Sequence, residues 1–251
     1  MKLTAALALI FALQLPAAGA QASKHNPKRA APPEKLRPAD AARPAVVVID
    51  PGHPSEVASG RTPQHGTNET EVAWAVALKL RDALQARGFE VVLTKSREDE
   101  LVRNRDRAAV ANRARASLMV RLHCDASVES GFAVYYPDRP GRSKDGSTGP
   151  GRAVIEGSRR AARTIHAAMA EGLGDALADN GVRTDNQTKV GREQGGALTG
   201  SIYSEVPVVT VEMVVLSDER DAEFIKAEEG QRRMAESIAD GVARFLEPKK
   251  K

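Results

Sequence analysis

Two histidines and one glutamate lie at or near the ends of three predicted strands in this 251-residue chain. His53 follows the run VVVIDPG at 46–52, His123 closes the run LMVRL at 118–122, and Glu212 interrupts the apolar run at 207–215. Imidazoles and carboxylates can bind metal ions or transfer protons. In open α/β sheets, functional sites collect beyond the carboxyl ends of strands. The three residues together predict a site, whereas a lone histidine in a loop is more simply a solvated or capping residue.

A fourth residue, Glu69, lies at the start of a predicted helix at 69–87. The apolar residues of this helix recur at steps of three and four, which is the pattern of a buried stripe: Ala73, Val76, Ala77, Leu80 and Leu84. Extended backwards, this stripe passes through Glu69 and misses Glu71. Asn68 is the expected N-cap, and Glu71 is expected to complete a capping box with it. A carboxylate on a buried stripe needs a partner, and a cation bound at the sheet edge would provide one.

Glu212 allows two interpretations. A carboxylate within an apolar strand is costly to bury unless it is paired, protonated or functional. It is either a general base with a tuned pKa or a structural carboxylate bonded to an arginine such as Arg107. Cys124, next to His123, is either a metal ligand or a small buried residue, and we expect it to be buried. His166 lies in a polar, alanine-rich segment and is expected to be a surface or packing residue.

These residues lie on a pattern of alternating strands and amphipathic helices. Strands are predicted at 45–50, 89–94, 118–123, 131–136 and 207–214, and helices at 69–87, 103–116, 153–178 and 219–246. In the strand 118–123, Leu118, Val120 and Leu122 should face one side and Met119, Arg121 and His123 the other. The prediction is a single α/β domain over residues 45–247. Its sheet should be mostly parallel or mixed, with about six strands flanked by helices.

The amino-terminal residues predict export. Lys2 precedes an apolar run at 3–15, and Pro16 and the small residues at 18–20 follow it. This is the pattern of a secretory signal peptide over residues 1–22, with cleavage after Ala20 or Ala22. The run is too short to cross a bilayer, and no later stretch is apolar enough to do so. We therefore expect an exported protein, periplasmic or extracellular at the cell wall.

A proline-rich and basic linker is predicted at residues 23–44. Residues 21–44 hold five of the fourteen prolines, with six Lys or Arg residues against two Asp or Glu residues. This segment therefore carries most of the net charge of +4, which leaves the body close to neutral. A nucleic-acid enzyme would carry its basic face on the body, so we expect no nucleic-acid partner. The tail is either weakly attracted to anionic wall or membrane surfaces or a solvated spacer.

Five motifs occur in an order that resembles the zinc-dependent N-acetylmuramoyl-L-alanine amidases of the amidase 3 type. They are Asp50-Pro-Gly-His53, Glu69 opening a helix that continues Val76-Ala77-Leu78-Lys79-Leu80, Arg107-x-x-x-Ala111-Asn112, Leu122-His123-Cys124-Asp125-Ala126 and Pro207-x-x-x-Val211-Glu212-Met213. The resemblance covers residues 45–246. It implies that His53, Glu69 and His123 bind Zn2+ and that Glu212 is catalytic. Two imidazoles and one carboxylate would leave a fourth position for water, as catalytic zinc sites do.

The same resemblance implies the substrate, which is the amide between N-acetylmuramic acid and L-alanine of the peptidoglycan stem peptide. Three segments depart from the usual pattern of the family: Pro54-Ser55-Glu56 replaces glycines, Asp125 replaces an asparagine, and 213–217 replaces a Gly-Phe-x-Ser-Asn sequence. Two alternative functions therefore stay open. One is another zinc amidase or peptidase acting on wall peptides, and the other is a catalytically weak wall-binding protein.

Overall fold

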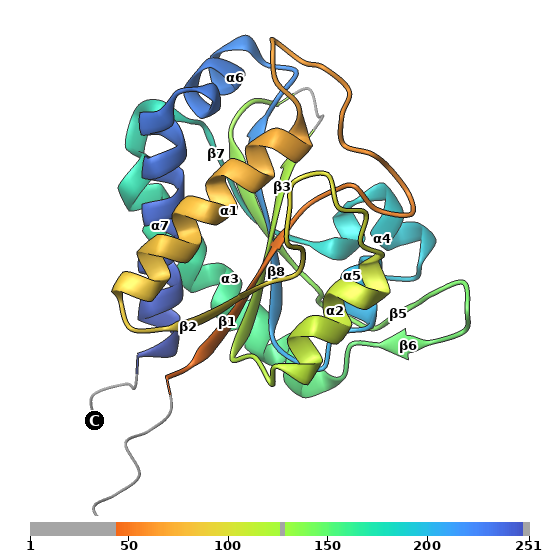
Figure 1. Cartoon of the computed structure of the whole chain (residues 1–251). Helices are drawn as coiled ribbons and strands as arrows, with labels where there is room; N and C mark the ends of the chain where they lie inside the picture. Colours follow the sequence, from red (N-terminus) through yellow and green to blue (C-terminus); the bar gives the residue numbers. More distant parts are fainter. Residues whose placement is uncertain (1–43, 126–128, 248–251) are drawn as a thin grey trace, which may run out of the picture. The chain divides into compact units, whose positions relative to one another are not determined.

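A computed structural model describes residues 44–125 and 129–247 of the chain (Figure 1). The predicted signal peptide and, apart from Pro44, the predicted linker lie outside the described residues. None of the helices in the described part of the chain is long and apolar enough to cross a membrane.

A six-stranded mixed sheet forms the centre of the domain, with the strand order β2-β1-β3-β8-β4-β7. The strands β2, β1, β3 and β8 are mutually parallel, β4 runs antiparallel to β8, and β7 is parallel to β4. This confirms the predicted single α/β domain. The bounds are β1 Val46–Pro51, β2 Glu90–Leu93, β3 Leu118–Asp125, β4 Phe132–Tyr136, β7 Asp179–Thr184 and β8 Val208–Val215, and a separate hairpin pairs β5 Gly141–Arg142 with β6 Thr148–Gly149.

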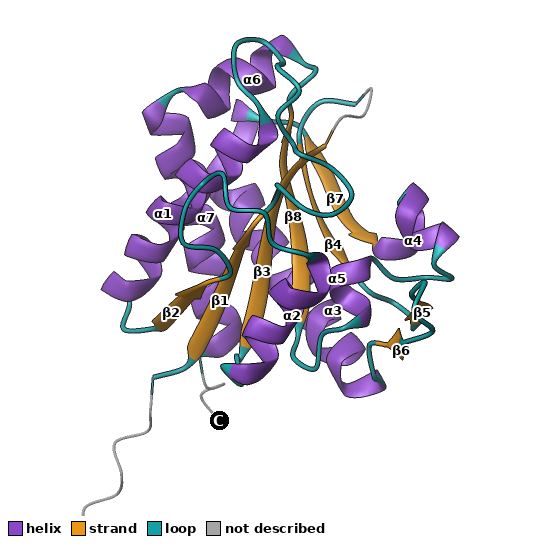
Figure 2. Ribbon diagram, turned by 45° about the vertical axis from the view of Figure 1, so that its right-hand side comes forward, coloured by secondary structure: helices purple, strands orange, loops and turns teal. Residues whose placement is uncertain are grey.

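Helices cover the two faces of the sheet unequally (Figures 1 and 2). The long helices α1 (Glu69–Ala86), α3 (Arg152–Leu173) and α7 (Glu228–Leu246) share one apolar cluster with the sheet. On the other face, α2 (Asn104–Arg113) packs against a smaller cluster. Three shorter helices lie in the connections: α4 Lys189–Glu193, α5 Thr199–Ile202 and α6 Glu219–Lys226.

The period-two pattern of β3 divides its side chains as predicted. Leu118, Val120 and Leu122 belong to the larger cluster beneath α1, α3 and α7, whereas Met119 belongs to the smaller cluster beneath α2. Because α2 is short, it covers only part of its face. The polar residues that follow Met119 on this face therefore line an open cleft at the carboxyl end of the strand.

The start of α1 places two neighbouring glutamates differently. Asn68 is the N-cap, and its side chain accepts a hydrogen bond from the Glu71 backbone N–H at 3.1 Å. The Glu71 side chain is exposed and accepts from the Thr67 hydroxyl at 3.3 Å, so the reciprocal bond of the predicted capping box is replaced by this contact. Glu69 turns towards the sheet edge, as the stripe predicted.

The structure corrects two predicted helices and adds one strand. The helix predicted at 153–178 ends at Leu173, and a short 3-10 helix at Gly174–Ala176 leads into the strand β7. This edge strand was missed because Val182 is its one apolar residue. The helical region predicted at 219–246 is two helices, since Ala227 between them has extended backbone angles.

A buried ion cluster ties β1 to α2 and β3. Asp50 is fully buried, and Arg107 and Arg121 are almost fully buried beside it. Arg107 Nη1 donates to Asp50 Oδ1 at 2.6 Å, and Arg121 Nε donates to Asp50 Oδ2 at 2.9 Å. The Thr94 hydroxyl adds a bond of 2.5 Å to the same carboxylate. Burial alone raises the pKa of Asp50, but the two guanidinium charges and the hydrogen bonds outweigh it and hold this pKa well below its usual range.

Replacing Asp50 should therefore destabilise the domain strongly. Asp50→Asn leaves two buried guanidinium groups without their counter-charge, and breaking a buried pair in this way costs about 3–5 kcal/mol. Chemical denaturation should show this loss in the free energy of unfolding. The control is Asp82→Asn, which removes the partner of Arg81 at an exposed position and should change stability by less than about 0.5 kcal/mol.

The sign of the pH dependence follows from the lowered pKa. A carboxylate whose pKa is lower in the folded chain stabilises it above the pKa of the unfolded chain, which is about 3.9. This stabilisation is lost as pH falls through the folded-state value. The stability difference between wild type and Asp50→Asn should shrink as the pH is lowered below about 4. If the difference in the free energy of unfolding stayed constant over this pH range, the lowered pKa of Asp50 would be contradicted.

Candidate functional site

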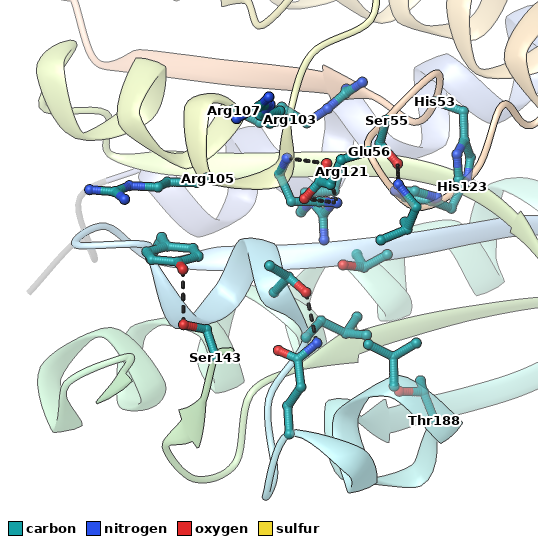
Figure 3. A pocket seen from close by; sticks show the side chains of 18 of the residues that line it. His53, Ser55, Glu56, Arg103, Arg105, Arg107, Arg121, His123, Ser143 and Thr188 are labelled. Atoms are coloured by element: carbon teal, nitrogen blue, oxygen red, sulfur yellow. Dashed lines mark hydrogen bonds between the residues drawn. The ribbon is translucent and has the colours of Figure 1, made fainter. Parts of the chain in front are cut away.

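A cleft of about 940 Å³ opens at the carboxyl ends of β1, β3 and β8, on the face that α2 leaves uncovered (Figure 3). His53, His123 and Glu212 line it, so the structure brings together the three residues that the sequence singled out. His53 follows β1, His123 lies near the carboxyl end of β3, and Glu212 lies within β8. Its opposite wall comes from the β5–β6 hairpin and from α4 and α5, with Ser143, Thr188 and neighbouring residues.

His53 is held in place by the turn that ends β1. Gly52 has no side chain at a point where a Cβ would lie 2.7 Å from the Leu122 carbonyl oxygen and 2.8 Å from the His123 ring. The next residue, His53, has a left-handed φ of 47°, which is costly for a residue with a side chain. Lys95 Nζ donates to the His53 carbonyl, and His53 Nδ1 lies 3.1 Å from the Ala58 carbonyl oxygen. A proton on Nδ1 satisfies this carbonyl and leaves the Nε2 lone pair free.

Glu69 lies between the two histidines. His53 Nε2 is 3.3 Å from Glu69 Oε2, and His123 Nδ1 is 2.8 Å from Glu69 Oε1. The Cys124 backbone N–H also donates to Oε1 at 3.2 Å. Ligand atoms of the three side chains all lie within 4.8 Å of one another. One helix start and two strand ends thus bring two imidazoles to one carboxylate.

The charge states of these side chains favour a cation. Burial lowers the pKa of His123 by more than the neighbouring Glu69 carboxylate raises it. The lowered pKa favours the neutral ring, which is the form that binds a metal ion. Burial raises the pKa of Glu69, but the hydrogen bond from His123 and the two imidazoles outweigh it, so this pKa is lowered and the side chain is anionic. Neutral imidazole and anionic carboxylate are the forms that bind metal ions.

The donor set therefore fits a metal ion. His53, Glu69 and His123 supply two nitrogens and one oxygen, which suits Zn2+ and leaves a coordination position open. His123 Nε2 is buried without a hydrogen-bond partner among the described residues, so this ring is not fully satisfied by protein groups. Cys124, which the sequence left open as a ligand, points to the other face and is buried in the larger core cluster.

Glu212 lies beside this triad on the neighbouring strand. β3 and β8 pair in register with His123 opposite Glu212. The Glu212 side chain lines the cleft, and its Oε2 is buried without a hydrogen-bond partner in the described part of the chain. Burial, with the charges of Glu69 and Asp125, raises the pKa of Glu212 well above its usual value. The alternative partner Arg107 donates to Asp50 and to the Pro51, Pro54 and Val102 carbonyls instead.

Comparison with known proteins identifies the family. The sequence profile of Amidase_3, described as N-acetylmuramoyl-L-alanine amidase, matches residues 47–244. The chain belongs to this family. The catalytic domain of CwlV, an N-acetylmuramoyl-L-alanine amidase from Bacillus (Paenibacillus) polymyxa var. colistinus, is 26% identical, with a TM-score of 0.62 over 80% of this chain and 98% of that one.

Two further known proteins are similar to the chain, one in fold and one in sequence. AmiC2 of Nostoc punctiforme, an N-acetylmuramoyl-L-alanine amidase, shares the fold at 23% identity, with a TM-score of 0.64 over 80% of this chain and 97% of that one. The N-acetylmuramoyl-L-alanine amidase AmiC of Neisseria meningitidis serogroup B is 25% identical in an alignment of length 221, which covers 80% of this chain and 52% of the relative. The chain thus spans about half the length of this curated relative.

Glu56 belongs to the segment Pro54-Ser55-Glu56, which follows His53 in place of the expected glycines, and it has a structural role. Glu56 accepts hydrogen bonds from the Asn104 backbone N–H at 2.9 Å and from its side-chain amide at 3.3 Å. A carboxylate at the first turn of α2 is favourable because it meets free N–H groups and the positive end of the helix dipole. The loop that carries His53 is therefore docked onto α2.

Sequence reasoning missed part of the cleft. Arg121 shares the face of His123 at period two, which could have indicated that it lines the cleft, and its Nη2 donates to Asn104 Oδ1 at 2.8 Å. The far wall was not predictable. There, Tyr203 donates to Asp145 at 2.8 Å and lies beneath the guanidinium group of Arg105, and these three residues come from three separate elements. His166 lies on α3 and bonds to Asp179, as a surface or packing residue would.

Glu69 and Glu71 provide a matched test of the metal triad. We expect Glu69→Gln to lose most bound metal, because the substitution removes the one anionic group between the two imidazoles. Glu71→Gln should keep it, since this exposed side chain bonds only the Thr67 hydroxyl among the described residues. Metal content of the purified variants, measured by mass spectrometry, decides whether Glu69 or Glu71 is the carboxylate ligand. If Glu71→Gln lost the metal and Glu69→Gln kept it, the assignment of Glu69 to the triad would be wrong.

Proposed function

We propose that this chain is an exported zinc hydrolase that cleaves the amide between N-acetylmuramic acid and L-alanine of the peptidoglycan stem peptide. The observation that carries the proposal is the triad His53, Glu69 and His123 with Glu212 directly beside it in an open cleft. Family membership supports this reaction. The signal-peptide pattern at 1–22 supports export to the periplasm or the cell wall.

His53, Glu69 and His123 would hold the zinc ion. When bound, zinc supplies Lewis-acid chemistry, which polarises a carbonyl group and makes water more acidic. The protein fixes the orientation of both imidazoles around the carboxylate. The carbonyl of Ala58 sets the proton on His53 Nδ1, and the tight packing at Gly52 fixes the ring of His123. Such surrounding contacts determine ligand orientation and basicity.

Glu212 would move the proton. Its buried Oε2 lacks a hydrogen-bond partner among the described residues, and it lies on the strand next to His123. As a general base, the carboxylate accepts a proton from the attacking water, and it then transfers this proton to the nitrogen of the departing L-alanine. The products are the lactyl carboxylate of N-acetylmuramic acid and a peptide with a free amino terminus.

Product analysis tests the reaction itself. Purified peptidoglycan treated with the zinc-loaded protein should release peptides that begin with L-alanine. It should leave glycan strands whose N-acetylmuramic acid carries no peptide, which mass spectrometry identifies after the strands are digested with a glycosidase. Cleavage within the stem peptide would instead indicate a zinc peptidase. A zinc-loaded protein that binds peptidoglycan and releases nothing would indicate a wall-binding protein.

Glu212→Gln should separate metal binding from catalysis. The amide keeps the volume and one oxygen but cannot accept a proton, so turnover should fall by about 10²–10⁴-fold. Zinc content should stay at the wild-type level, because Glu212 is not one of the three grouped donors. The matched control is Glu156→Gln, an exposed change at the start of α3 that should leave turnover unchanged. Near-normal turnover in a folded, zinc-loaded Glu212→Gln protein would refute the role as base.

A further inference from the structure

The floor of the cleft carries polar side chains in two rows across neighbouring strands. In the first row, Glu212 of β8 lies opposite His123 of β3. In the second row, Thr210 of β8 lies opposite Arg121 of β3 and Tyr135 of β4. Residues 210 and 212 face the same side of the sheet, and two residues along a strand are roughly 7 Å apart. Thr210 is therefore one step along the cleft floor from the proposed base.

The Thr210 hydroxyl is buried and lacks a hydrogen-bond partner in the described part of the chain. The residue is 3% exposed, and its Oγ1 makes no hydrogen bond to any described residue, although it lines the cleft. Its neighbour Arg121 is already committed to Asp50 and Asn104. An unsatisfied buried hydroxyl is costly, so its presence needs an explanation.

Gln194 provides a second unpartnered group in the same cleft. Its Nε2 donates to the Thr199 hydroxyl at 2.8 Å, which fixes the side-chain amide and leaves Oε1 buried without a partner among the described residues. Six buried side-chain atoms in the described part of the chain lack a partner. Four of them belong to residues that line this cleft: His123, Gln194, Thr210 and Glu212. His123 and Glu212 belong to the proposed catalytic site, and the other two have no role in it.

We propose that Thr210 and Gln194 form a subsite for the backbone amides of the stem peptide that follow the scissile bond. This inference rests on the proposed function. A carbonyl oxygen that accepts and a hydroxyl that donates or accepts match the N–H and C=O of a peptide group. An extended peptide advances about 3.3–3.6 Å per residue, so the spacing between residues 210 and 212 covers about two residues. The peptide arm of the substrate thus runs from Glu212 towards Thr210 along the cleft floor.

Substrates of different length test this subsite. The zinc-loaded wild type should cleave an N-acetylmuramoyl tripeptide with a higher kcat/KM than N-acetylmuramoyl-L-alanine, which has no amide after the scissile bond. Thr210→Val should lower kcat/KM for the tripeptide by roughly 3–10-fold, as expected for one hydrogen bond, mainly through KM. The shorter substrate should be unaffected. Thr164→Val on α3, where the hydroxyl donates to the Arg160 carbonyl, is the kinetic control and should leave kcat/KM unchanged for both substrates.

Thermal stability separates binding from a structural role. Thr210→Val replaces an unsatisfied hydroxyl with a methyl group, so the Tm should stay the same or rise. Thr94→Val makes the same chemical change where the hydroxyl donates to Asp50, so its Tm should fall. A Tm loss in Thr210→Val equal to that of Thr94→Val, without a length-dependent change in KM, would assign Thr210 a structural role and overturn the inference.

Gln194→Met keeps the experiment decisive if Thr210→Val does not fold. It should also reduce the ratio of kcat/KM for the tripeptide substrate to kcat/KM for N-acetylmuramoyl-L-alanine, while leaving zinc content unchanged. If this ratio stays at its wild-type value in the folded variants, the proposed subsite is wrong, and the Thr210 hydroxyl and the Gln194 carbonyl oxygen are satisfied by water alone. A wild-type protein that cleaves neither substrate would instead overturn the proposed function, and this inference with it.

Discussion

One buried carboxylate, Asp50, connects the elements that position the site. It is the common acceptor for Arg107 of α2 and Arg121 of β3. Arg107 also donates to the carbonyls of Pro51 and Pro54, on either side of the His53 turn. The loop that carries His53 is therefore held by the same guanidinium group that neutralises Asp50. A charge buried in this way needs complete pairing, which couples the geometry of the loop to the stability of the core.

The same cluster gives the two faces of the sheet different roles. On the face beneath α1, α3 and α7, the alternate residues of β3 and β8 are apolar and closely packed. On the opposite face, Met119 and Val208 meet α2, and the residues after them on each strand are charged or polar. Arg107 and Arg121 are both bonded to Asp50, whose single negative charge offsets one of their two positive charges. Glu69 and Glu212 lie beside His123, where their carboxylates can face a cation.

Local patterns predicted much of this arrangement. The period of two in β3 and the strand-end positions of His53 and His123 place both imidazoles at one edge, and the helical stripe separates Glu69 from Glu71. Each of these inferences depends on residues close together in the chain. β7 was missed because an edge strand with one apolar residue has no clear periodicity. The partners of Asp50 and the far wall built by Tyr203 and Asp145 depend on contacts between distant segments, which one sequence does not encode as a pattern.

The distribution of unsatisfied groups separates the functional surface from the rest of the interior. The buried polar groups that tie elements together, such as Asp50 with its arginines and Asp221 with the Gly131 and Val215 N–H groups, have partners within the protein. Most of the buried side-chain atoms that lack one in the described residues belong to cleft residues. Each such atom costs roughly 1–3 kcal/mol of desolvation that folding alone does not recover. A ligand that satisfies these atoms gains interactions without further ordering of the protein, since the surrounding contacts already fix them. The residues that destabilise the free domain are therefore those that make its cleft ready to bind a polar, amide-rich substrate.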